Sequence, residues 1–462
     1  MFMAMVRLFF LFLLLFSPRV VIAQKPQRLM AEKTRILFVL DASGSMLNKW
    51  DGDLRINIAK DRLAKLVDSL KVNPNVELAL RVYGHQFDAK QKNCKDSKLE
   101  VGFEANSHAK IKATFAKLAP KGTTPIAYSL EQATKDFPDD RNYRNLIIMI
   151  TDGIEACNGD PCAIALGLQK KGIILRPFII GLGVGKDFTA AFNCIGKAID
   201  AKSGDDFALA LSNIATQTLG KTTVAVELLD ENNQPIEKDI NMSFINSVTQ
   251  EGVYDLVHFR DGKGKTDLLE IDPVLTYDLV VNTIPPVSKK NIEIEGGKHN
   301  TIRLKTPQGT LKFNMKTPKE YGNLQAIVRQ SGKNQTLHHQ PIDDTEKYLV
   351  GSYDVEVLTR PRIYFNDVNI KQSQITELGI EQPGILNVIN MMDGLASLYV
   401  IESGQPRFVE NIDTVSKIMN IVMQPGDYKL VFRPREAVSS AYTVVKKFTI
   451  SAGKIAYIDI LK

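Results

Sequence analysis

The sequence predicts a doubly wound (Rossmann-like) α/β domain followed by an all-β array of small sandwich domains. Three observations lead to this fold class. In the first half of the chain, short apolar runs alternate with segments of helical periodicity. From Thr222 onward the helical patterns disappear, and short alternating segments separated by turn residues take their place. Within this second half, one pattern recurs at a nearly constant spacing.

The first predicted strand is the apolar run of residues 35–40, which leads into Asp41, Ser43 and Ser45. The run is too short for a membrane-spanning helix and is apolar on both faces, as in a parallel strand covered by helices. In open α/β sheets, ligands bind at the carboxyl ends of the strands. Carboxylate and hydroxyl oxygens suit a hard cation, and Mg²⁺ or Mn²⁺ fits them better than Zn²⁺. The run therefore predicts a metal site at this strand end.

The following segments complete the α/β pattern. Apolar residues at steps of three and four from Ile56 to Leu70 predict the first helix. We expect further helices over residues 109–118, 125–137, 161–171 and 206–219, and further strands over residues 76–83, 98–103, 146–151 and 173–181. The strand over 146–151 is followed, like the first strand, by an acid, Asp152. Because the carboxyl ends of parallel strands share one edge, Asp41 and Asp152 should meet there, with a third hydroxyl from the loop of residues 121–125.

These motifs resemble the von Willebrand factor A domain with its metal-ion-dependent adhesion site. The family pattern of Asp-x-Ser-x-Ser, a loop Thr and a later Asp-Gly is matched by Asp41, Ser43, Ser45, Thr124 and Asp152. The resemblance implies that Ser43 and Ser45 ligate Mg²⁺ (or Mn²⁺) directly, Thr124 directly or through water, and the two acids largely through water. One coordination position would stay open, and a carboxylate of a protein partner would complete it.

Several residues near this site have two interpretations. Thr123 is an alternative ligand to Thr124, and Thr124 could instead serve only as a helix cap. Glu155 and Asp160 could bind metal, although we favour capping of the following helix by Asp160. Trp50, the only tryptophan, could belong to a partner surface or pack over the first helix.

Residues 1–23 have the pattern of a secretory signal peptide, with one early positive charge, a long apolar stretch and small residues before a cleavage site after Ala23. Residues 24–33 form a linker, and no second apolar run is long enough to span a membrane. We expect the mature chain to be secreted or periplasmic. In such a compartment an even number of cysteines predicts two disulfides with the pairing open, here among Cys94, Cys157, Cys162 and Cys194. The loop after Asp152, with its paired cysteines, resembles that of secreted bacterial members of the family.

The second half contains three related copies. Corresponding strands begin at Tyr277, Tyr353 and Tyr428, which lie 76 and 75 residues apart. A period of this size predicts an array of domains, each a small β-sandwich, rather than a solenoid. We therefore divide the chain into an α/β domain over residues 34–219 and sandwich repeats over residues 222–306, 307–383 and 384–462. The last copy resembles carboxypeptidase-regulatory-like and PEGA-type modules, which are extracellular spacers and binding surfaces.

Charge and motifs favour binding over catalysis. The net charge of +6, or +4 without residues 1–23, is too small to indicate a nucleic-acid partner. We find no Gly-x-Ser-x-Gly or His-Glu-x-x-His motif, and the first strand does not end in Asp-x-Asp, because Ala42 and Ser43 follow Asp41. The six histidines are scattered. The adjacent His338 and His339 would face opposite ways on a strand, so we do not expect them to share a metal.

The sequence thus predicts a secreted, non-enzymatic module that binds an acidic residue of a protein partner through a divalent cation. The β-domains would act as a spacer or a second binding surface. One alternative is a structural component of an envelope assembly in which the metal only stabilises the fold, and a hydrolase is a weaker alternative.

Overall fold

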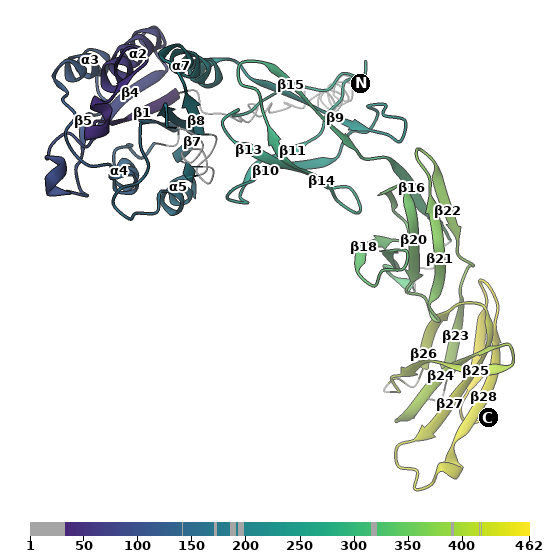
Figure 1. The fold of residues 1–462 in the computed structure, drawn as a ribbon. Helices are drawn as coiled ribbons and strands as arrows, with labels where there is room; N and C mark the ends of the chain where they lie inside the picture. Colours follow the sequence, from purple (N-terminus) through teal and green to yellow (C-terminus); the bar gives the residue numbers. More distant parts are fainter. Residues whose placement is uncertain are drawn as a thin grey trace, which may run out of the picture. The chain divides into compact units, whose positions relative to one another are not determined.

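The structure is a computed structural model, and it describes residues 33–140, 142–170, 173–184, 191–192, 198–315, 321–389, 392–414, 416 and 418–462. The predicted signal peptide and Cys194 lie outside the described residues. The chain divides into two compact units, one of residues up to 211 with 270–272, the other of residues 212–269 with 273–462 (Figure 1). Among the described helices, none is long and apolar enough to cross a membrane.

The first unit is built on a six-stranded sheet with the strand order β5-β4-β1-β6-β7-β8. Its strands are β1 (Lys33–Asp41), β4 (Val76–Tyr83), β5 (Ser97–Val101), β6 (Tyr143–Thr151), β7 (Ile173–Leu182) and β8 (Ala198–Ala201). All neighbouring strands are parallel except β5, which runs antiparallel to β4 at the edge. The helices are α2 (Arg55–Leu70), α3 (Ser107–Lys117), α4 (Ile126–Ala133), α5 (Pro161–Lys170) and α7 (Gly204–Leu219).

Helices cover both faces of this sheet, with α2, α3 and α7 on one face and α4 and α5 on the other (Figure 1). Strand β1 is therefore buried from Thr34 to Asp41. Leu37 and Val39 pack in one cluster with Leu130 of α4 and Leu168 of α5. Helix α2 buries the apolar stripe that the sequence indicated, namely Ile56, Ala59, Leu63, Leu66, Val67 and Leu70. The predicted α/β fold class is confirmed.

Three local features differ from the sequence prediction. The helix expected over residues 125–137 ends at Ala133, because the chain tightens into a turn in which Asp136 donates its N–H to the Ala133 carbonyl. The Asp136 carboxylate then accepts two hydrogen bonds from buried Arg81, at 2.6 and 2.7 Å, which hold that turn. Strand β8 and the hairpin of β2 (Lys49–Trp50) and β3 (Asp53–Leu54) were not predicted, since they are too short for a periodic pattern. Two short 3-10 helices, η2 (Gly44–Leu47) and η3 (Ala89–Gln91), follow strand ends.

The second unit contains three pairs of sheets, each a three-stranded and a four-stranded sheet. The first pair is formed by β9 (Thr223–Leu229), β10 (Asn241–Asn246), β11 (Gly252–Val257), β12 (Leu269–Glu270), β13 (Thr276–Val281), β14 (Val287–Glu293) and β15 (His299–Lys305). The second pair is formed by β16 (Gln308–Asn314), β17 (Gln325–Gln330), β18 (Thr336–Pro341), β19 (Thr345–Leu349), β20 (Gly351–Val357), β21 (Ile363–Ile370) and β22 (Ile375–Gly379). The third is formed by β23 (Gly384–Ile389), β24 (Gly394–Glu402), β25 (Gln405–Ile412), β26 (Ile418–Met423), β27 (Gly426–Pro434), β28 (Val444–Ile450) and β29 (Ile455–Asp459), with the 3-10 helix η5 (Ser440–Tyr442) between β27 and β28.

The three pairs share one plan. In each, the first strand runs parallel to the last, as β9 with β15, β16 with β22 and β23 with β29. The repeated tyrosines, Tyr277, Tyr353 and Tyr428, are all buried. The hydroxyl of Tyr353 donates to the Leu349 carbonyl at 2.7 Å, and that of Tyr428 donates to the Gln424 carbonyl at 2.7 Å. In both cases the tyrosine hydroxyl bonds the backbone carbonyl four residues earlier in the chain. This is a tyrosine-corner contact, which ties the chain before the strand to the edge of the sandwich.

Candidate functional site

The site lies at the carboxyl ends of β1 and β6, which are neighbours in the sheet with Leu40 beside Ile150. The helices that follow these two strands, α2 and α5, lie on opposite faces of the sheet (Figure 1). The two chain segments therefore diverge at this edge, and such a switch point leaves a crevice where ligands bind in open α/β sheets. Asp41 ends β1 and Asp152 follows β6, so the fold brings both acids to one place.

Asp41 is fully buried and held at both carboxylate oxygens. Its Oδ1 accepts the Ser43 N–H at 2.7 Å, and its Oδ2 accepts the Thr151 hydroxyl at 2.7 Å. Burial, and next the nearby charge of Asp152, raise the pKa of Asp41 to about 6. A buried carboxylate that loses solvation and faces a second negative charge is an environment that a cation would relieve.

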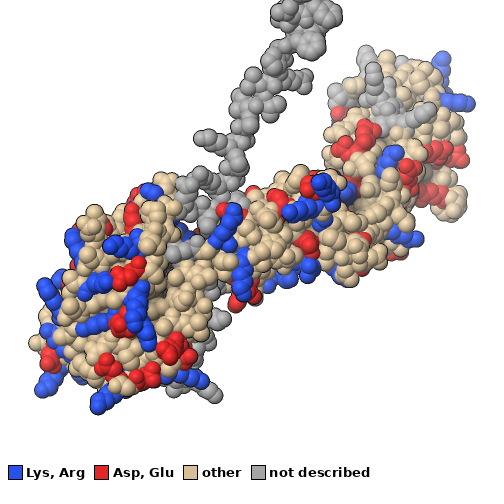
Figure 2. All heavy atoms as spheres, turned by 90° about the horizontal axis from the view of Figure 1, so that it is seen from above, with Lys and Arg blue, Asp and Glu red and all other residues tan. Residues whose placement is uncertain are grey.

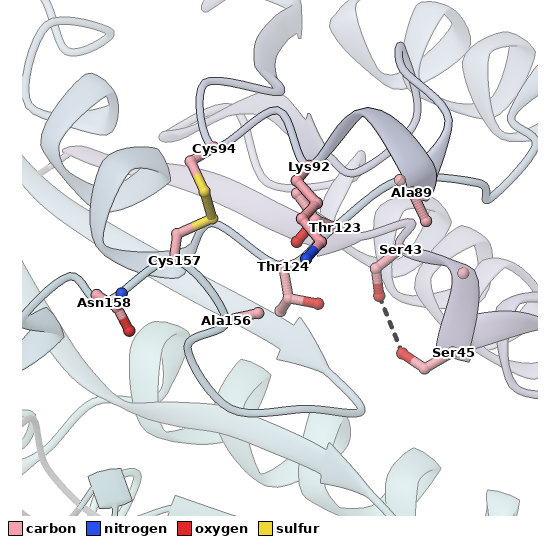
Figure 3. Close-up of a pocket in the computed structure, with 12 residues that line it drawn as sticks. Ser43, Ser45, Ala89, Lys92, Cys94, Thr123, Thr124, Ala156, Cys157 and Asn158 are labelled. Atoms are coloured by element: carbon pink, nitrogen blue, oxygen red, sulfur yellow. Dashed lines mark hydrogen bonds between the residues drawn. A yellow bond between two sulfur atoms is a disulfide. The ribbon is translucent and has the colours of Figure 1, made fainter.

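The two serines lie in the segment that directly follows Asp41. Ser43 precedes η2 in an extended conformation, and Ser45 lies within it. Their hydroxyl oxygens are 3.0 Å apart (Figure 3). The Ser45 hydroxyl also donates to Asp152 Oδ1 at 2.6 Å. The contacts join the two strand ends, so four of the five sequence-predicted residues, Asp41, Ser43, Ser45 and Asp152, form one connected cluster.

Arg55 is a member of this cluster that the sequence analysis missed. Its Nη1 donates to Asp152 Oδ2 at 2.9 Å, with the Arg55 side chain 16% exposed and the Asp152 side chain fully buried. Arg55 is the first residue of α2, so the fold aims its side chain across the β1 strand end. The sequence signal was its position just before the first predicted helix, which alone does not identify a partner. Arg55 thus pairs with Asp152 alone, while Asp41 has only the neutral donors Ser43 N–H and Thr151 hydroxyl.

The threonine loop closes the site from the side. Gly44 donates its N–H to the Gly122 carbonyl at 3.0 Å, and Gly122 donates to the Gly84 carbonyl at 2.8 Å. This contact requires glycine at 84, where φ is +72° and a Cβ would lie 2.8 Å from the Ser43 backbone. Thr124 is buried, and its hydroxyl faces the serine side of the pocket (Figure 3). Thr123 also lines the pocket and is less buried.

An acid from the neighbouring loop caps helix α4, and Thr124 does not. Glu155 accepts the Ala127 N–H at 2.6 Å and the Cys157 N–H at 2.7 Å. Asp160 accepts the N–H groups of Cys162 and Ala163 at 2.9 and 3.1 Å, which is the predicted cap of α5. Both acids therefore have backbone partners, and the helix-cap interpretation holds for Asp160 and extends to Glu155.

The cavity next to the serines has a volume of about 490 Å³. Its walls come from four chain segments and are formed by Ser43, Gly44, Ser45, Ala89, Lys92, Cys94, Gly122, Thr123, Thr124, Ala156, Cys157 and Asn158. A disulfide between Cys94 and Cys157 joins two of the segments along its wall (Figure 3). Cys162 is also disulfide-bonded, and Cys194 lies outside the described residues.

The remaining candidates lie elsewhere. Trp50, in β2, packs against Gly183, where a Cβ would approach its Nε1 to 2.6 Å, and it is partly buried there. His338 and His339 are successive residues of β18 and pair with Val328 and Ile327, so they face opposite sides of that sheet. Among the described residues, no group of three His, Cys, Asp or Glu side chains could hold a metal ion. The donors available at the β1 edge are hydroxyls with two acids behind them, a set that suits a hard cation.

Comparison with known proteins gives a consistent family. The profile of the von Willebrand factor type A domain matches residues 36–155. The uncharacterized protein YwmD of Bacillus subtilis (strain 168) is 32% identical over 184 residues, which is 38% of this chain and 81% of YwmD. The uncharacterized protein YwmC of the same organism is 28% identical over 180 residues, 38% of this chain and 78% of YwmC.

Two solved structures are also similar to this chain. The pilus adhesin SpaC of Lactobacillus rhamnosus GG is 11% identical, with 93% of this chain and 83% of that chain covered and a TM-score of 0.35. Proximal thread matrix protein 1 of the mussel byssus, with zinc in its MIDAS motif, is 21% identical, with 40% of this chain and 45% of that chain covered and a TM-score of 0.33.

Proposed function

Because this chain belongs to the von Willebrand factor type A domain family, we propose that it is a protein-binding module that holds a divalent cation and, through it, an acidic side chain of a partner. The observation that carries the proposal is the hydrogen-bonded cluster of Asp41, Ser43, Ser45 and Asp152 at the sheet edge, next to an open cavity. The β-sandwich repeats would then act as a spacer or a second binding surface.

In this proposal Ser43 and Ser45 ligate the cation directly, Thr124 directly or through water, and Asp41 and Asp152 mainly through water. Hydroxyl and carboxylate oxygens are the ligands that a hard cation prefers, and this donor set supports Mg²⁺ or Mn²⁺.

The bound cation would supply a Lewis-acid position that accepts a carboxylate from outside. The protein residues have other tasks. Asp41 and Asp152 provide negative charge at a distance from the ion, and their own hydrogen bonds fix the serine loop. No catalytic step is part of the proposal. Ser43 and Ser45 hydrogen-bond to each other, and Ser45 donates to Asp152, so the contacts place both hydroxyls beside the candidate metal position.

A binding role is better supported than a purely structural role for the metal. The loops that carry the site are already joined by direct contacts, including the Ser45–Asp152 and Arg55–Asp152 hydrogen bonds and the Gly44–Gly122 backbone bond. The loops are therefore joined by contacts that do not depend on a metal. We further propose, on the sequence pattern of residues 1–23, that the protein acts outside the cytoplasm.

A thermal melt of residues 24–462 in EDTA, Mg²⁺, Mn²⁺ and Ca²⁺ tests the metal site without a partner. An ion at 100 times its dissociation constant adds about 2.7 kcal/mol to stability, which corresponds to about 5–10 °C for a unit of this size. We expect Mg²⁺ and Mn²⁺ to raise one transition in the wild type and to leave Asp41→Ala and Asp152→Ala unchanged. An equal response of the wild type and both variants contradicts the proposed site.

A further inference from the structure

Lys92 contributes a positive charge to the wall of the cavity beside the serine cluster. Its side chain extends into the cavity, with the ammonium group towards Thr123 and Thr124 (Figure 3). It belongs to the loop that follows β4, at the end of η3, and has a left-handed backbone with φ 46°. The cavity therefore offers two different attachment points for anions, the candidate metal position at the serines and a lysine on the adjoining wall.

Three further lysines are direct sequence neighbours of wall residues. Lys90 and Lys95 flank Lys92 in the same loop, and Lys121 precedes the wall residue Gly122. All four are exposed, and within the described part of the chain none of them forms an ion pair. We call Lys90, Lys92, Lys95 and Lys121 the lysine rim.

The acids near the lysine rim are already engaged with backbone donors. Asp88 accepts the Lys90 N–H at 3.0 Å. Asp96 is fully buried and accepts the N–H groups of Gln86 and Phe87. Glu100 binds Lys98 at 3.0 Å and His85 at 2.9 Å, outside the rim. The four rim lysines outnumber the two acids of the loop, Asp88 and Asp96, so a net charge of about +2 remains (4 − 2).

The rim is also held in place before any partner arrives. Ala89 donates its N–H to the Lys121 carbonyl at 2.9 Å, which joins the two segments of the rim. Cys94 fixes the end of the loop to Cys157 on the opposite wall. Buried Asp96 ties the start of the loop through three hydrogen bonds to Gln86 and one to Phe87. Because these contacts fix the loop backbone in advance, binding costs little backbone entropy there.

We propose that this face recognises a protein segment that carries several neighbouring carboxylates, one for the cation and the others for the lysine rim. The inference rests on the proposed function, since it adds a second contact beside the metal position. An isolated acidic residue would use only the metal. An acidic cluster would also form charge-assisted hydrogen bonds with Lys92 and would be attracted by the other three lysines.

Two synthetic peptides test the proposal, one with a single aspartate among glycine and serine residues and one with three consecutive aspartates in the same frame. Binding to residues 24–462 is measured in Mg²⁺ and in EDTA, for the wild type and for a variant with all four rim lysines changed to Gln. A matched control changes four exposed lysines of the β-sandwich unit to Gln, namely Lys265, Lys289, Lys290 and Lys333.

We expect the wild type in Mg²⁺ to bind the three-aspartate peptide about tenfold more tightly than the one-aspartate peptide. This preference should disappear in the rim variant and persist in the control, while the Mg²⁺-dependent melting shift stays the same in all three proteins. A preference that survives in the rim variant, or no binding of either peptide to the wild type at about 1 mM, overturns the inference. Rim-dependent binding of equal strength in EDTA and Mg²⁺ would instead refute the metal-mediated contact and leave the lysine rim supported.

Discussion

At the scale of single residues, the site is defined by how two buried acids are neutralised. Asp41 has only neutral hydrogen-bond donors, the Ser43 N–H and the Thr151 hydroxyl. Asp152 has the Arg55 guanidinium as well as the Ser45 hydroxyl. The pair therefore keeps about one excess negative charge in a place with little solvent, which favours capture of a cation. Arg55 limits this excess and so sets how strongly the site attracts metal.

Changing Arg55 to Gln should separate the two effects. Asp152 would lose its buried ion-pair partner, so we expect the metal-free protein to be about 3 kcal/mol less stable. The site would also become more negative, and the Mg²⁺ affinity should rise about tenfold. Calorimetric titration with Mg²⁺ and melts in EDTA measure both quantities.

Arg62→Gln is a suitable control for this change, because Arg62 lies on the same helix and pairs with the exposed acids Asp61 and Asp205. It should alter neither quantity by much. Weaker Mg²⁺ binding by Arg55→Gln would contradict the role of Arg55 as a competing positive charge, and would mean that it chiefly positions Asp152.

At the scale of elements, loops that are distant in sequence are joined around the cavity. The Cys94–Cys157 disulfide closes a loop of 63 residues between the β4 side and the β6 side of the site. The backbone contacts of Gly44, Gly84 and Gly122 bring the serine and threonine loops to close approach. These cross-connections fix the loops that line the cavity relative to one another.

The double substitution Cys94→Ser/Cys157→Ser should destabilise the first unit. Chain entropy predicts a loss of up to about 4 kcal/mol for a closed loop of this length. Urea unfolding followed by far-ultraviolet circular dichroism would measure the loss, and binding of the three-aspartate peptide should weaken because the lysine loop is no longer tethered. Full stability of the variant would show that the loop contacts suffice without the disulfide.

In the β-sandwich unit, the tyrosine contact should contribute similarly in each copy that has it. Tyr353→Phe removes the 2.7 Å hydrogen bond to the Leu349 carbonyl while it keeps the buried ring. We expect a loss of about 1 kcal/mol in the unfolding free energy of the second unit. Tyr364→Phe is the comparison, because Tyr364 is 59% exposed and should change stability much less.

At the scale of the whole molecule, the two units differ in what they can do with a cation. The candidate ligands all belong to the first unit. Over the face shown in Figure 2, basic and acidic side chains are interspersed, in keeping with a net charge of only +6. Attraction of an acidic partner is therefore expected to be local to the site rather than spread over the chain.

Metal should accordingly act on one unit alone. Calorimetry of the full chain tests this if the two units unfold in separate transitions. The transition of the first unit is the one that Cys94→Ser/Cys157→Ser lowers, and Mg²⁺ should raise its melting temperature. The transition of the second unit is the one that Tyr353→Phe lowers, and Mg²⁺ should leave it unchanged. The two variants thus assign the transitions. A shift of the Tyr353-sensitive transition by Mg²⁺ would place a metal in the β-sandwich unit and contradict this assignment.

The sequence by itself determined the fold class, the buried stripe of α2, the tyrosine period and the five candidate ligands, because each depends on local periodicity or on short motifs at strand ends. The tertiary structure decided the pairing of Cys94 with Cys157, the contact of Arg55 with Asp152, the cap that Glu155 provides and the position of Lys92 on the cavity wall. These contacts join residues that are 28 to 97 positions apart or come from separate loops. No local pattern encodes them, since they arise only when the packed sheet brings its strand ends together.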